Sequence, residues 1–151
     1  MASVVTNKGK FNLLEWGFQK ANIPTNLYLA LVTNAVAPVA DTNTKSELTE
    51  LANGNGYTTG GISVAMNATD FDVITEDDTN DRALVQIKDE VWTASGGPIP
   101  ASGTGAYYAI LTDDNVTQGS REVLVSWDIS GPVSVSDTQT LTLQNCETRL
   151  T

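Results

Sequence analysis

Residues 107–143, which read YYAILTDDNVTQGSREVLVSWDISGPVSVSDTQTLTL, decide the fold of this chain. The stretch begins with a short apolar run over residues 107–112, and the polar residues 113–115 follow it. Further along, Val123, Val125 and Trp127 are interleaved with Leu124 and Ser126. Alternation with a period of two is typical of a half-buried strand. The stretch therefore predicts successive β-strands joined by polar turns.

The residues before this stretch carry the same pattern toward the N-terminus. Residues 27–33 (LYLALVT) are apolar and bounded by polar residues, as in a buried strand. Ile62, Val64 and Met66 alternate with small residues, and residues 83–93 hold two more short runs. Several short strands separated by turns predict a mainly β fold, either a β-sandwich or a jelly-roll-like single domain.

The N-terminal region is predicted to hold the main helix. Phe11, Leu14, Phe18 and Ala21 recur at the spacing of one helical face. We expect this apolar face to pack into the core. Asn7 is expected to cap the start of the helix, because a short polar side chain there can accept a backbone N–H.

The domain organisation follows from these elements. Residues 1–7 are predicted to form an extended N-terminal arm, and residues 8–151 a single β-rich domain. Thr44 and Glu47 match the spacing of a capping box, which predicts one further short helix. The glycine-containing turn at residues 53–56 is expected to end this segment.

Composition excludes several classes of function. The chain has 151 residues, a net charge of −10 and only eight lysines and arginines, so we expect no binding to nucleic acid. It has no apolar run of the length that spans a bilayer, so we expect no membrane insertion. The first ten residues lack the apolar core of a signal peptide, which predicts synthesis in the cytoplasm.

The residues also offer little catalytic chemistry. The chain has no histidine, which removes Ser-His-Asp and Cys-His machinery and the commonest zinc ligand. Residues 77–88 fail the EF-hand pattern, and no glycine run matches a phosphate-binding loop. We therefore expect no catalytic, cofactor-binding or metal-binding residue. The one enzyme class that the residues permit is a polysaccharide hydrolase, whose acid pair would come from Asp70, Asp72, Glu76, Asp77 or Asp81.

The order of several segments resembles a known group of proteins. These segments are LYLALVTN, ELTELANGNGYTTGGISV, DDTNDRALV, VWTASGG, AYYAILTDD and VLVSWDISGPVSVSDTQTLTLQ. The chain resembles small structural proteins of tailed-bacteriophage virions, of the head decoration (cement) or tail-associated type, over residues 11–150. The most specific pieces are the turns at residues 52–57 and 77–82, the second being followed by Trp92.

The resemblance implies a non-enzymatic role in the virion. A decoration protein attaches to the capsid surface and reinforces it, so the expected partners are the major capsid protein or other virion proteins. We also expect a homo-oligomer, with a trimer preferred to a dimer. Val4, Val5 and Trp16 are candidate apolar partner contacts, although Trp16 is equally compatible with burial in the core. Lys8 and Lys10 are candidate charged contacts.

Two other functions remain open at this point. The first is a structural protein of the tail, neck or baseplate, which the same resemblance permits. The second is a carbohydrate-binding β-sandwich module, in which Trp92, Tyr107, Tyr108 or Trp127 would stack on sugar rings.

Overall fold

The computed structural model describes residues 1–151. Its strands and its α-helix are β1 (Ala2–Val5), α1 (Asn7–Leu14), β2 (Asn26–Val32), β3 (Ile62–Ala65), β4 (Val73–Asp77), β5 (Arg82–Ile87), β6 (Glu90–Thr93), β7 (Ala106–Thr112), β8 (Val123–Val133), β9 (Thr140–Leu143) and β10 (Cys146–Leu150). A π-helical segment continues α1 over Glu15–Gln19, and 3-10 turns lie at Lys45–Glu47 and Gln118–Ser120. The mainly β prediction is confirmed. None of the helices has the length and apolar character needed to cross a bilayer.

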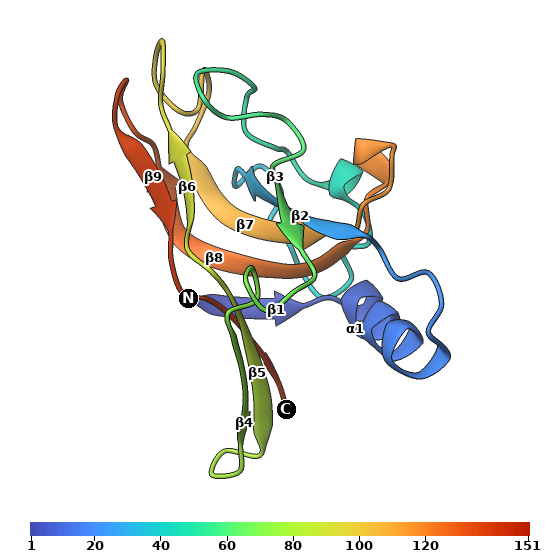
Figure 1. Ribbon diagram of the computed structural model, residues 1–151. Coiled ribbons are helices and arrows are strands. Elements are labelled where there is room, and N and C mark those ends of the chain that lie inside the picture. The colour runs from blue at the N-terminus through green and yellow to red at the C-terminus, as the bar shows by residue number, and fades with distance from the viewer.

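The strands form three antiparallel sheets (Figure 1). The largest has the order β1-β8-β7-β2-β3, the second the order β10-β5-β4, and the third pairs β6 with β9. In Figure 1 the long strand β8 curves beneath β7, and the β4–β5 hairpin projects away from the body of the domain. The chain therefore presents a protruding hairpin beside a compact sheet.

Two apolar clusters lie on opposite faces of the five-stranded sheet. Strand β2 shows the division, because Leu29 and Leu31 belong to the larger cluster while Ala30 and Val32 belong to the smaller one. The larger cluster joins this sheet to the other two, since it also contains Ile87 from β5. A strand whose two faces are both buried reads as a continuous apolar run, as residues 27–32 do.

The helix packs with a different face from the one expected. Phe11, Leu14 and Phe18 were predicted to be core residues, and this prediction is wrong because all three are exposed. The buried positions of α1 are Gly9 and Asn12. An added Cβ on Gly9 would lie 2.1 Å from the carbonyl oxygen of Leu124 in β8, so only glycine permits this approach. Close backbone packing, rather than hydrophobicity, therefore sets the orientation of the helix.

The predicted N-terminal arm contains the extended strand β1. Strand β1 pairs with β8 in register Val4 to Ser126 and Val5 to Val125, which makes it an edge strand of the large sheet. Thr6 ends this strand and caps α1, since its hydroxyl accepts the N–H of Gly9 at 2.8 Å. The cap is thus one residue earlier than predicted.

A buried polar network holds the turn after the predicted capping box. The box is confirmed, although the helix that it starts is a single 3-10 turn. Lys45 and Glu50 form a buried ion pair at 2.5 Å, and the same carboxylate accepts the hydroxyl of Tyr57 at 2.8 Å. The Tyr57 hydroxyl also accepts the N–H of Leu31 at 3.0 Å. Burial raises the pKa of Tyr57 far above its ordinary value, so the phenol stays protonated.

Candidate functional site

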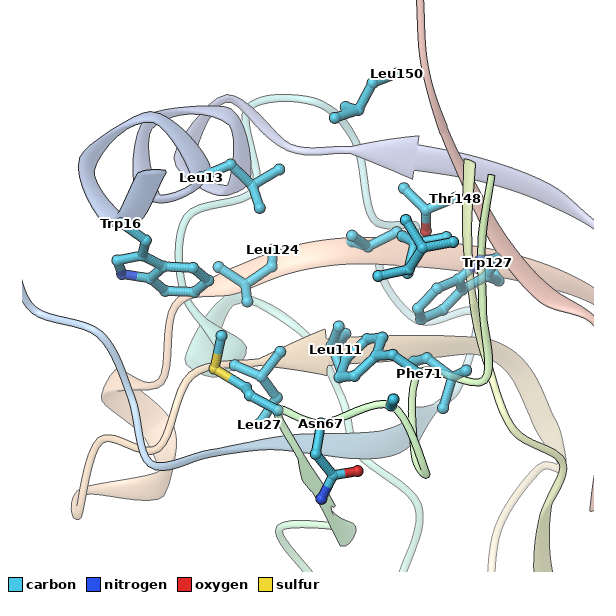
Figure 2. A pocket seen from close by; sticks show the side chains of 16 residues that line it. Leu13, Trp16, Leu27, Asn67, Phe71, Leu111, Leu124, Trp127, Thr148 and Leu150 are labelled. Atoms are coloured by element: carbon cyan, nitrogen blue, oxygen red, sulfur yellow. The ribbon is translucent and has the colours of Figure 1, made fainter. Parts of the chain in front are cut away.

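An open apolar groove of about 530 Å³ lies between the large sheet, the helix and the projecting hairpin (Figure 2). Fourteen of its sixteen lining residues are hydrophobic. The lining residues are Leu13, Trp16, Leu27, Met66, Asn67, Ala68, Phe71, Ile74, Val85, Ile87, Leu111, Leu124, Val125, Trp127, Thr148 and Leu150. The groove has neither a charged side chain nor a cluster of titratable groups in its lining, so its chemistry is that of an apolar contact surface.

The elements of the fold give this groove a floor and two walls. Leu27, Leu111 and Leu124 form the floor on β2, β7 and β8, as Figure 2 shows. A bulge in the pairing of β7 with β8 lies between Leu111 and Thr112, opposite the start of β8. Leu124 and its neighbour Val125 both line the groove, so the bulge places two adjacent residues on one face.

The first wall is the helix. Leu13 and Trp16 point from α1 and the following π-helical turn toward the groove (Figure 2). Trp16 is only 9% exposed, and its indole N–H donates to the carbonyl of Asn22 at 3.0 Å. Of the two expectations for Trp16, the structure bears out burial in the core, so the ring is not an exposed anchor.

The second wall is the face of the β10-β5-β4 sheet that points into the groove. Residues directly opposite each other in antiparallel strands lie on the same face. Ile74 pairs with Val85, and Val85 pairs with Thr148, so these three line the groove together. Ile74 is 76% exposed although it is apolar, which leaves this wall open to a partner.

An exposed apolar helix face borders the groove. We define this face as Phe11, Leu14 and Phe18, of which Phe18 is 85% exposed. Leu13, one residue before Leu14, already lines the groove. The helix therefore carries apolar side chains on two sides, Leu13 in the groove and the helix face on its exposed side, in a chain whose net charge is −10.

A polar cleft of about 270 Å³ lies on the other side of the helix. Its carboxylates are already engaged, because Glu122 accepts both the Lys8 ammonium at 2.9 Å and the Asn12 amide at 2.8 Å. Asp113 accepts the N–H of Glu122 at 2.9 Å, while burial raises the pKa of Asp113. These contacts tie the helix to β8, so the predicted contact residue Lys8 has an internal role.

Two of the acidic residues between positions 70 and 81, Asp70 and Asp77, have structural roles. Asp70 accepts the Lys88 ammonium at 2.6 Å, and this hydrogen bond lowers the pKa of Asp70. Asp77 accepts from Asn80 at 2.9 Å and from Arg82 at 2.7 Å, and these two bonds lower the pKa of Asp77. The hairpin turn is thereby closed. Neither carboxylate borders the apolar groove, so the acid pair of a glycosidase is not assembled there.

The aromatic residues named for sugar stacking are not on a free surface. Trp92 and Trp127 are both buried, and the Trp127 indole donates to the carbonyl of Glu147 at 2.9 Å. Tyr107 and Tyr108 are half-buried in β7. Sugar stacking needs an exposed ring face, which the two buried tryptophans do not offer.

The predicted partner contacts are spread over the N-terminal region. Val4 is 38% exposed on the edge strand β1, Val5 is half-buried, and Lys10 is exposed on the helix. None of these three lines the groove. Sequence reasoning missed the groove itself, since its walls come from residues 13–16 and residues 74–150, which are far apart in the chain.

Comparison of the chain with protein-family models, curated proteins and solved structures finds no match. The functional assignment therefore rests on the groove, the helix face and the charges around them.

Proposed function

We propose that this chain is a non-enzymatic structural protein of a tailed-phage virion, which attaches to the capsid surface and reinforces it as a decoration protein. The observation that carries the proposal is the presence of two exposed apolar surfaces, the groove and the helix face. Large exposed apolar patches are uncommon on monomeric soluble proteins and mark interaction sites. A surface of this kind on a strongly acidic domain is suited to binding another protein.

The rest of the surface supports attachment rather than turnover. The groove lining offers no group that could move a proton, because it consists of apolar side chains together with one asparagine and one threonine. The edge strand β1 carries Val4 and leaves backbone groups available for a neighbouring strand. We propose that the partners are the major capsid protein or other virion proteins.

Repetition makes weak contacts sufficient for this role. A protein that binds a shell in many copies gains from multivalency, so each single contact can be modest. A homo-oligomer raises this gain further, since its copies engage the shell together. Attachment of this kind requires no catalytic residue, cofactor or metal ion.

The proposal is tested by counting and locating the protein in purified virions. A decoration protein is expected on the head in hundreds of copies, measured by quantitative mass spectrometry and immunogold labelling. About six to twelve copies at one vertex or along the tail would instead identify a tail, neck or baseplate protein. Absence from the virion would overturn the proposal altogether.

A pair of matched variants tests whether the helix face is the attachment surface. Phe18→Asp places a charge on this face, and we expect it to lower the copy number on the head. Val91→Asp is the control, because Val91 is also exposed but lies on β6, outside the groove lining. Equal loss in both variants, or in neither, would contradict the assignment of the surface.

A further inference from the structure

We infer that the groove is filled by a second copy of this chain, in a two-fold arrangement in which the helix of each copy faces the hairpin of the other. This inference rests on the proposed function, because it names the occupant of the groove in the same virion protein and leaves the helix face to the capsid. The evidence is a charge pattern that complements itself across the groove.

The positive flank of the groove is the helix. Of the eight lysines and arginines, five form ion pairs within the chain, and Arg121 lies over the Tyr28 ring at 3.6 Å. Lys10 and Lys20 are the two that remain, and both are exposed. Lys10 lies three residues before Leu13, which lines the groove, so the two side chains share one side of the helix.

The negative flank is the hairpin. Ile74 lines the groove, and Glu76 lies two residues further along β4, so both side chains lie on the groove side of that strand. Glu76, Asp78 and Asp81 are exposed and have no ion-pair partner within the chain. Lys10 and Glu76 thus flank the groove on the helix and on the hairpin, with Lys20 at the end of the helical segment and Asp78 and Asp81 in the hairpin turn.

A two-fold axis through the groove places the positive flank of each copy opposite the negative flank of the other. The lysines of the first copy then face the hairpin acids of the second, and the reverse contact forms by symmetry. Complementary charges at the rim steer association and reject wrong partners, while the apolar centre supplies most of the affinity. Local complementarity therefore allows two chains of net charge −10 to associate.

The test is the molar mass of the purified chain in the absence of any other virion component. Sedimentation equilibrium at low ionic strength is expected to show a concentration-dependent mass of twice the 16.0 kDa of the chain. Lys10→Glu with Lys20→Glu is expected to weaken dimerisation at least tenfold, and so is Glu76→Lys with Asp78→Lys. The control Asp41→Lys with Asp89→Lys changes two exposed acids outside the groove and is expected to leave the dimerisation constant within about twofold, in line with the small effect of remote surface charges.

Recombining the charges separates pairing from a general effect of charge. A chain that carries all four reversals has both flanks exchanged, so it is expected to dimerise again within about threefold of the wild type, which screening and imperfect geometry allow. Mixing the lysine-reversed chain with the acid-reversed chain is expected to give a one-to-one dimer. Failure of both rescues would overturn the inference.

Other occupants of the groove would appear as different results. A wild-type chain that stays at 16.0 kDa at every accessible concentration would overturn the inference and assign the groove to another protein. A mass of three chains would overturn the two-fold arrangement, and so would an apolar small molecule retained in the groove in native mass spectrometry. Because this experiment contains no capsid, its failure is distinct from absence of the protein from virions.

Discussion

Replacing Gly9 by alanine tests which face of the helix packs on the sheet. The new Cβ would lie 2.1 Å from the carbonyl oxygen of Leu124, and a backbone oxygen cannot rotate away. Overpacking costs about 1–3 kcal/mol, and this rigid contact belongs at the upper end of that range. Alanine recovers about 1 kcal/mol through its higher helix propensity. The expected net loss of stability is therefore about 2 kcal/mol.

Gly17 provides the matched control in the turn that continues the same helix. An added Cβ at Gly17 meets no atom within 4 Å, so Gly17→Ala is expected to leave the stability unchanged or to raise it by up to about 1 kcal/mol. Urea denaturation measures both variants. With a slope of about 2 kcal/mol per molar, the Gly9→Ala midpoint should fall by about 1 M. A Gly9→Ala protein as stable as the wild type would refute the orientation of the helix, and with it the exposure of the Phe11, Leu14 and Phe18 face.

Three further predictions concern buried and paired groups. Tyr57→Phe leaves Glu50 short of one hydrogen bond in the buried network, so we expect a loss of about 1–3 kcal/mol in urea denaturation, and no loss would contradict that network. The Lys88 hydrogen bond lowers the pKa of Asp70, so its contribution is present above about pH 4 and is lost as the pH falls through the folded-state pKa. The stability difference between wild type and Asp70→Asn should accordingly shrink in acid, and a difference that grows there would count against the pair. Burial raises the pKa of the Cys146 thiol to about 12, so a thiol reagent at pH 8 should label it only after unfolding, and rapid labelling of the native chain would disprove its burial.

Strand positions were predictable from the sequence because they depend on local patterns. The apolar run at residues 27–33 became β2, and the alternation around Trp127 became β8. The turn at residues 77–82 also lies where its polar residues predicted it, between β4 and β5. Period-two alternation and turn residues act over a few positions, so a sequence shows them directly.

The orientation of the helix could not be predicted from hydrophobicity. The Phe11, Leu14 and Phe18 stripe had the spacing of a core face, yet Gly9 brings the opposite side of α1 onto β8. The available signal was the glycine itself, since an unexplained glycine in a helix suggests a close backbone approach. The sequence pattern predicts that this helix face is buried, whereas the fold of the single chain leaves it exposed. Such a disagreement is expected where the face binds another protein.

The groove could not be predicted because it is a product of topology. Its walls are α1 and the β10-β5-β4 sheet, and no local pattern places residue 13 beside residues 74 and 150. The sequence indicated Lys8 and Lys10 alike as charged contacts, whereas in the structure Lys8 pairs with Glu122 at 2.9 Å and Lys10 has no ion-pair partner within the chain. Partner contacts therefore depend on which charged side chains already form ion pairs within the chain.

Hydroxyl-radical footprinting of the wild-type chain tests most directly whether the apolar helix face is an interface. Oxidation of Phe11, Leu14 and Phe18 is measured by mass spectrometry in the dilute free protein and in purified virions, with Val91 as the internal reference. Strong oxidation in the free protein and protection in the virion, with Val91 oxidised equally in both, is the predicted result. Equal oxidation of the helix face in the two states would contradict the account.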